Sequence, residues 1–346
     1  MSFRFWATTL TLVLITLVVY FGWSEITEAW NLIGSINLWL FMLIIPVQLL
    51  SYFSVGEIMF SYLRAKGDLK RITRWQMTRV ALESNFVNHI VPVPAAAGFS
   101  YLNWVFNRFG VSGGRATMAQ IIRVVAVFVS FVLLVIVSVL VLSFDNKVNK
   151  TIVIVSLLFI AAAIGGTVFV IYSVSNHKRL VTLSAWLTKT GNKLLSFFTR
   201  GKKKEVIKLK SVEKFFIDIH QDYLEITRDK KILIQPMLWA TLTNILDVSL
   251  IAIAFYSLGF WVNPAVLFIA FGLSSIAAAF MVTPGGAGVY EAIMIGFLTS
   301  SGMPTGIAIA GTLLARSILL ILTISFGYIF YQLTINKYGK ISSTNI

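Results

Sequence analysis

The stretch FMVTPGGAGVYEAIM, residues 280–294, decides the fold, because it places a proline, three glycines and a glutamate between two strongly apolar segments. Pro284 must interrupt any helix there, since proline lacks a backbone N–H and its ring clashes with the preceding turn. Of the 346 residues, 57% are hydrophobic and only 12% are charged, and the mean hydropathy is +0.83. These values are typical of a polytopic membrane protein. The stretch therefore predicts a broken helix inside an all-α membrane protein.

The composition also excludes several kinds of site. No cysteine occurs, which excludes disulfides, thiolate catalysis and Cys-type metal sites. The three histidines, His89, His177 and His220, are too scattered to indicate a metal site. We attribute the net charge of +15 to basic residues in the cytoplasmic loops of a membrane protein rather than to a surface that binds nucleic acid. We expect no metal, no cofactor and no nucleic-acid partner.

Apolar runs of about 20 residues, the length that crosses a bilayer as a helix, predict six full transmembrane helices. They are expected at residues 5–22, 36–63, 116–143, 151–174, 232–259 and 304–333. The loop 64–79 carries six Lys or Arg against one acid and is placed in the cytoplasm. The charged residues of the loop 24–35 are all acidic, so this loop is placed outside. This topology puts both termini in the cytoplasm of a single integral domain in the cell membrane.

Residues 176–231 form the one long polar stretch, with fourteen Lys or Arg against six Asp or Glu. Two apolar stripes within it recur at helical spacing, as expected of helices that lie in the headgroup plane. We expect this cytoplasmic segment to pack on the membrane surface. It is either a loop that only sets topology or a site for anionic lipid headgroups or a partner.

Two further apolar regions, 80–108 and 264–300, contain helix breaks. Pro92 and Pro94 interrupt the first, and its arm 80–91 is too short to cross a hydrocarbon core of about 30 Å. We predict two re-entrant hairpins, the first opening to the cytoplasm and the second to the outside. Two full crossings per region, giving eight or more crossings in total, fit the loop charges equally well.

An internal repeat relates the two halves of the chain. An acid inside a span, followed by Pro-x-x-x-Gly, recurs after 190 residues, so that Glu57, Pro94 and Gly98 correspond to Asp247, Pro284 and Gly288. In the next span, Arg123 corresponds to Arg316 after three extra residues. Because the two sets have opposite predicted orientations, they indicate an inverted-topology repeat with halves at about 36–143 and 232–335.

Five charged residues fall inside apolar segments: Glu57, Arg123, Asp247, Glu291 and Arg316. Each costs about 2.5 to 3.5 kcal/mol at a helix centre if it faces lipid, so we expect them to face a cavity or one another. In one hypothesis the two arginines meet an anionic headgroup, and the acids receive a cationic group or couple a proton. In the other, all five form salt bridges that only hold the bundle together.

The broken helices supply polar backbone groups at membrane depth. Free N–H groups after a proline lie at the positive end of a helix, and glycines let a phosphate approach them closely. The candidate residues are Pro284, Gly285, Gly286 and Gly288 on the second hairpin, and Asn88, His89, Pro94 and Gly98 on the first. Asn88 and His89 either contact substrate or satisfy the backbone groups that the prolines free.

The run TPGGAGVYE at 283–291, the following span with Arg316, and NFVNHIVPVPAAAG at 85–98 with Arg123 resemble the lysylphosphatidylglycerol synthetase transmembrane-region family. This family is the flippase-like half of bacterial aminoacyl-phosphatidylglycerol synthases and their stand-alone relatives, and the resemblance covers about residues 10–335. It implies a protein that moves a lipid between leaflets, with Glu291 and Arg316 near the pathway. The tRNA-using catalytic domain of the fused proteins is not found in this sequence.

We therefore expect a lipid flippase-like transporter for an anionic or aminoacylated phospholipid, not an enzyme, with a separate lipid-modifying synthase as a partner. One alternative is a membrane glycosyltransferase that uses a polyprenyl phosphate. It needs an acidic pair on an external loop, and no Asp-x-Asp occurs. Another is a non-transporting scaffold for lipid or envelope synthesis, which would depend on residues 176–231 rather than on the membrane charges.

Overall fold

The structure, a computed structural model, describes residues 34–90, 94–143, 229–279 and 286–338, together with single positions at 31, 154, 157, 161, 165 and 172. Regular structure in these residues is entirely helical. The helices of the first part are α3 (Leu38–Met42), α4 (Ile44–Ala65), α5 (Arg74–Ile90), α6 (Pro94–Arg108) and α7 (Gly113–Ser143). Those of the second part are the 3-10 helix η1 (Lys230–Leu233) and the α-helices α11 (Ile234–Ser257), α12 (Pro264–Ala279), α13 (Val289–Ser300) and α14 (Thr305–Tyr338).

Among the described residues, four stretches of helix are long and apolar enough to cross a membrane: Leu38–Ala65, Gly113–Leu142, Lys230–Ser257 and Thr305–Lys337. They confirm the helices that the sequence predicts at 36–63, 116–143, 232–259 and 304–333. The predicted span at 5–22, most of the predicted span at 151–174 and almost all of the basic segment 176–231 lie outside the described residues. The chain is an all-α polytopic membrane protein.

The outward surface of these helices is apolar. On α7, Val124, Leu133, Val137 and Leu140 are each more than half exposed. A continuous apolar face of this kind is unfavourable in water and is the surface that a helix presents to acyl chains. The helices bury their other faces against one another.

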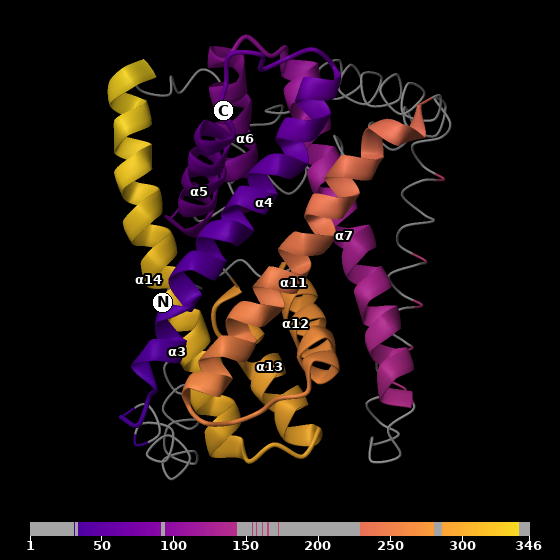
Figure 1. Cartoon of the computed structure of the whole chain (residues 1–346), viewed down its shortest axis with the longest axis vertical. Coiled ribbons are helices and arrows are strands. Elements are labelled where there is room, and N and C mark those ends of the chain that lie inside the picture. Colours follow the sequence, from indigo (N-terminus) through magenta and orange to yellow (C-terminus); the bar gives the residue numbers. More distant parts are fainter. Residues whose placement is uncertain are drawn as a thin grey trace, which may run out of the picture.

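The two remaining helix pairs are shorter. The helices α5 and α6 pack against each other, and so do α12 and α13. They have 17, 15, 16 and 12 residues, or roughly 18–26 Å at 1.5 Å per residue, which is less than a hydrocarbon core of about 30 Å. Figure 1 shows α4, α7, α11 and α14 running the length of the molecule, with the α5–α6 pair near one end and the α12–α13 pair near the other.

The packing of the two pairs is reciprocal. Helix α5 packs against α14, and α12 packs against α7, so each pair contacts the last long helix of the other half. The first long helices of the two halves, α4 and α11, pack along each other. The shift of 190 residues that takes Glu57 to Asp247 also takes the first residue of α4, Ile44, to the first residue of α11, Ile234.

The two largest hydrophobic cores among the described residues lie at different levels of the bundle. One includes Met59 of α4 and is otherwise built mainly from α5, α6 and α7, while the other includes Ile44 of α4 and is built from α11, α12, α13 and α14. Between these two positions α4 carries Gln48, Ser51 and Tyr52, all buried. A polar layer therefore separates the two cores.

Candidate functional site

The second helix pair carries an ion pair at the start of α13. Arg316 Nε of α14 donates to Glu291 Oε1 at 2.8 Å, and the backbone N–H of Gly288 donates to Glu291 Oε2 at 2.7 Å. The Arg316 guanidinium also lies over the ring of Tyr290, 4.3 Å from its centroid. One carboxylate thus caps a helix and holds a cation from a neighbouring helix.

Glycine is required where the chain turns into α13. Gly286 has φ +68°, in the left-handed region that favours glycine. A Cβ at this position would overlap the Cβ of Ala278 on α12. The turn can therefore lie against α12 only because residue 286 has no side chain. The predicted site residues Pro284 and Gly285 lie outside the described residues.

Asp247 extends this site to the first half of the chain. Ser51 Oγ of α4 donates to Asp247 Oδ1 of α11 at 2.6 Å. Asp247, Glu291 and Arg316 all lie close enough to the buried Tyr290 hydroxyl to act on it electrostatically. The structure therefore brings three of the five predicted membrane charges into one cluster.

A hydrogen-bond network continues from this cluster to the first helix pair. The hydroxyl of Tyr52, next to Ser51 in α4, bonds the hydroxyl of Thr323 on α14 at 2.7 Å and accepts a hydrogen bond from Asn85 Nδ2 of α5. Gln48 Nε2 donates to the same Thr323 hydroxyl at 3.2 Å. The network links α4, α5 and α14 beside the charged cluster.

Sequence reasoning missed Gln48, Ser51, Tyr52 and Thr323. A signal was present in this apolar helix, because Ser51 and Tyr52 follow Gln48 by three and four residues and Ser54 follows Ser51 by three. Residues at these spacings share a helix face. Such a polar stripe in a membrane helix indicates an interior face, since lipid offers no hydrogen-bond partner.

On the first helix pair, Asn88 bonds the backbone. Gly98 N of α6 donates to Asn88 Oδ1 of α5 at 2.9 Å, and a Cβ at Gly98 would overlap the Asn88 side chain. This contact joins the two arms of the pair. Pro94 is the first residue of α6, where its missing N–H costs nothing. The side chains of His89 and Pro94 lie outside the described residues.

The other two membrane charges lie apart from the cluster. Glu57 is buried, and its Oε1 lies 3.6 Å from Nε of Arg74, whose side chain is 61% exposed. Arg123 has a buried Nε that makes no hydrogen bond. Glu57 therefore has different contacts from Asp247, its counterpart in the predicted repeat. The contacts of Arg123 likewise differ from those of its counterpart Arg316.

A second buried acid, Glu83, was not considered in the sequence. It accepts hydrogen bonds from the Tyr101 hydroxyl of α6 at 2.6 Å and the Thr334 hydroxyl of α14 at 2.7 Å. Arg79 Nη2 lies 3.9 Å from Glu83 Oε1. The carboxylate thus ties α5 to α6 and α14. An acid in the run VALESNFV, residues 80–87, was a visible signal for such a buried role.

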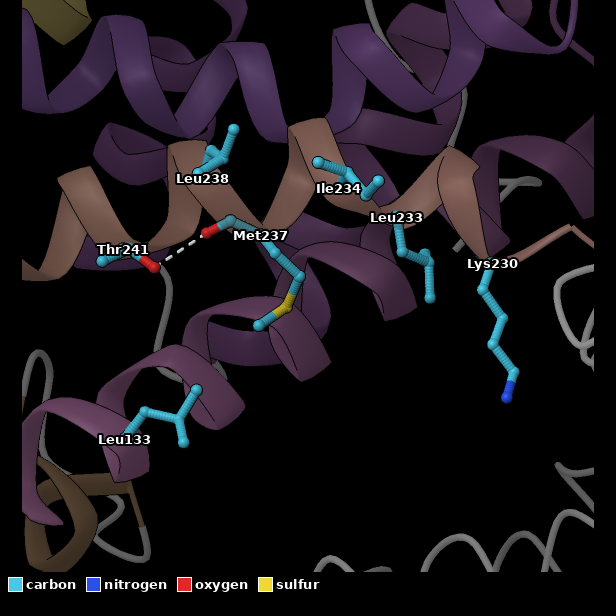
Figure 2. A pocket seen from close by; sticks show the side chains of 7 residues that line it. All are labelled: Leu133, Lys230, Leu233, Ile234, Met237, Leu238 and Thr241. Carbon is cyan, nitrogen blue, oxygen red and sulfur yellow. Dashed lines mark hydrogen bonds between the residues drawn. The ribbon is translucent and has the colours of Figure 1, made fainter.

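An open groove with a volume of about 430 Å³ lies between α7 and α11, and Figure 2 shows the side chains that line it. Its lining is mostly apolar and consists of Leu133, Lys230, Leu233, Ile234, Met237, Leu238 and Thr241. The Thr241 hydroxyl donates to the backbone carbonyl of Met237 at 2.9 Å, so it offers no free donor. The groove suits an acyl chain rather than a headgroup.

Within the helices described above, no three His, Asp or Glu side chains come together as a metal site needs. The arrangement is instead one of paired charges and hydrogen bonds between helices in a medium of low dielectric constant. Such a layer can exchange its internal partners for the charges of a polar ligand.

Comparison with protein families gives a match to the lysylphosphatidylglycerol synthase TM region over residues 6–327. No curated protein gives a match. The family match spans most of the chain, including both helix pairs, the ion pair at Glu291 and the polar layer. It confirms the family that the sequence motifs indicate. The chain belongs to the family of the lysylphosphatidylglycerol synthase transmembrane region.

Proposed function

We propose that this protein is a flippase-like transporter that moves an anionic or aminoacylated phospholipid between the leaflets of the cell membrane. The observation that carries the proposal is the Glu291–Arg316 ion pair, which lies where a broken helix pair meets the polar layer between two hydrophobic cores. Family membership supports it, because the family is described through lysylphosphatidylglycerol, an aminoacylated phospholipid. The proposal assigns no covalent step to this chain, and a separate synthase would supply any aminoacylated lipid.

The two short helix pairs are re-entrant in this proposal, and the two halves form an inverted repeat. Three observations support it. The pairs lie near opposite ends of the molecule (Figure 1), each packs against the last long helix of the other half, and α4 and α11 begin at positions related by the same 190-residue shift as Glu57 and Asp247. An inverted repeat places a central site between two halves that can open in turn to either side.

The charges at the ends of the bundle support an orientation. The end that carries the α4–α5 turn and the start of η1 has Arg64, Lys66, Lys70, Arg71 and Lys230 among its described residues. The described loops at the other end, 258–263 and 301–304, carry no charge. By the positive-inside rule, the basic end is cytoplasmic. The α5–α6 pair then opens to the cytoplasm and the α12–α13 pair to the outside.

The ion pair provides a way to couple headgroup binding to a change of shape. A phosphate competes with Glu291 for Arg316, because both are anionic partners of a guanidinium. Once released, Glu291 is free to pair with an ammonium group of an aminoacylated headgroup. The same carboxylate caps α13 through the N–H of Gly288, so its displacement loosens the start of that helix. The acyl chains remain outside the bundle, where grooves such as the one between α7 and α11 accommodate them.

The proposal is tested by leaflet exchange of a labelled phospholipid in proteoliposomes. We expect exchange by the wild-type protein with an anionic or aminoacylated lipid, and a loss of about tenfold or more in Glu291→Gln and Arg316→Ala, because each leaves a membrane charge unpaired. Arg71→Ala is the matched control, since Arg71 is an exposed loop residue. The absence of exchange by wild type with every lipid of these two classes would overturn the transport function.

A further inference from the structure

The two arginines that the repeat relates have different surroundings. Arg316 is paired with Glu291 and stacked on Tyr290. Arg123 forms no ion pair within the described part of the chain, and its buried Nε has no hydrogen-bond partner. The first-half residue at the 190-residue shift from Glu291 is Tyr101, which is not an acid. Its hydroxyl donates to Glu83 instead.

Neighbouring contacts place Arg123 on an interior face of α7. Gln120 and Val127, three residues before and four residues after it, share its side of the helix. Gln120 Nε2 donates to Asn103 Oδ1 of α6 at 3.3 Å, and the Val127 carbonyl accepts from Asn244 Nδ2 of α11 at 2.9 Å. The Arg123 side chain therefore lies on the face that α7 turns toward α6 and α11, not toward lipid.

The depth of Arg123 makes an unpaired charge unfavourable. It is ten residues beyond the start of α7, or about 15 Å along the helix axis, which is within the hydrocarbon layer if α7 crosses the membrane. A buried cation without a partner is strongly unfavourable there. One turn earlier, Gln120 Oε1 is also buried without a hydrogen-bond partner. Of these two groups, the Arg123 Nε is a donor and the Gln120 Oε1 an acceptor, so the guanidinium is the group that an anion can satisfy.

We propose that Arg123 binds a phosphate-type anion without first displacing an internal partner. The anion is either part of a lipid headgroup or free phosphate. A guanidinium without an acid partner takes an anion directly. At Arg316, by contrast, an incoming anion must first displace Glu291. The first half of the chain therefore binds the anion, and the second half holds a neutralised pair that opens later. This inference rests on the proposed function only in taking the anion to be carried by a lipid.

Thermal unfolding of the full chain in a neutral detergent tests the site. The probes are short-chain phosphatidylglycerol, phosphatidylcholine with matched chains, and inorganic phosphate. In the absence of anion, we expect Arg123→Gln to be at least as stable as wild type, because it removes an uncompensated charge. A purely structural role for Arg123 predicts a lower melting temperature instead.

With anion added, we expect the melting temperature of wild type to rise with phosphatidylglycerol but not with phosphatidylcholine. Arg123→Gln should weaken that response about tenfold or more in concentration, and Arg123→Lys should retain part of it, since the charge is kept. Arg71→Gln, at an exposed loop arginine, is the matched control and should respond as wild type does. A response to inorganic phosphate alone that is lost in Arg123→Gln also supports the site and identifies free phosphate as its ligand.

The site is disproved if Arg123→Gln responds to the anionic probes as wild type does, or if neither anion stabilises the wild-type protein. Leaflet exchange is measured separately, so the two proposals fail independently. If the anion response depends on Arg123 but no lipid is exchanged, the transport proposal is disproved and the anion-binding site is still supported. If the Arg123→Gln protein no longer binds the anion but exchanges lipid as wild type does, the site has no role in transport.

Discussion

Arg316 Nε lies 2.8 Å from Glu291 Oε1, although the two residues are 25 positions apart on different helices. Their side chains are 29% and 17% exposed, so the pair is partly shielded from any solvent. The other carboxylate oxygen of Glu291 accepts the N–H of Gly288, which has φ +90°. A glycine turn, a helix cap and an interhelical ion pair are thus coupled through one side chain.

This coupling predicts the effect of neutralising one partner. Glu291→Gln should lower the free energy of unfolding by about 1–3 kcal/mol, because a glutamine can still accept the Gly288 N–H but removes the carboxylate charge from beside Arg316. The double variant Glu291→Gln/Arg316→Gln should recover part of the loss. Thermal or denaturant unfolding in detergent measures both. Equal stability of Glu291→Gln and wild type would show that the pair contributes nothing.

The glycines of the second helix pair give a second prediction. Gly286→Ala should destabilise the protein by about 1–3 kcal/mol, because it places a Cβ against Ala278 in a left-handed backbone conformation. Gly296→Ala in α13 is the matched control. A Cβ there meets nothing within 4 Å, and alanine favours a helix over glycine. Comparable losses in both variants would contradict the close packing of the turn on α12.

The buried Glu83 network predicts a third result. Tyr101→Phe and Thr334→Val each remove one hydrogen bond to a carboxylate that is fully buried. Each should therefore lower the unfolding free energy by about 1–3 kcal/mol. Tyr328→Phe is the control, because Tyr328 is 51% exposed. If Tyr101→Phe melts at the same temperature as Tyr328→Phe, Glu83 does not depend on these donors.

The proposed topology predicts which side of the membrane each loop faces, and labelling of single introduced cysteines tests it. Because the sequence contains no cysteine, no native residue is labelled. Single cysteines at Lys70 and Asn107, at the two outer ends of the α5–α6 pair, should react with an impermeant maleimide only from the cytoplasmic side. Cysteines at Trp261 and Ser300, which flank the α12–α13 pair, should react only from the outside. All four positions are exposed. Labelling of Lys70→Cys and Asn107→Cys from opposite sides would replace the re-entrant pair with an odd number of full crossings.

Much of the fold was predictable, because a bilayer permits few solutions. Four predicted spans coincide with long apolar helices to within a few residues, since a helix is the only open-chain structure that satisfies its own backbone in lipid. The helix breaks were predictable for the same reason, as Pro92, Pro94 and Pro284 cannot donate to a helical hydrogen bond.

The candidate site was predictable only in part. Its charges stand out in an apolar sequence, and Glu291 and Arg316 were found in this way. Ser51, Tyr52 and Thr323 were not found, because a neutral polar residue costs little free energy in a membrane helix and is common there. Glu83 was not predicted as a buried site although its charge is visible in the sequence, because its partners Tyr101 and Thr334 come from other helices.

The sequence by itself determined the class of protein, the long apolar helices, the positions of the breaks and the family, because these depend on composition and local spacing. Only the tertiary structure decided which charges are paired. The predicted repeat relates Glu57 to Asp247 and Arg123 to Arg316, but the partners of each are set by distances between helices that no local pattern records. That is why Arg316 meets Glu291 on a neighbouring helix, Asp247 meets Ser51, and Arg123 is left with an unsatisfied donor on an interior face.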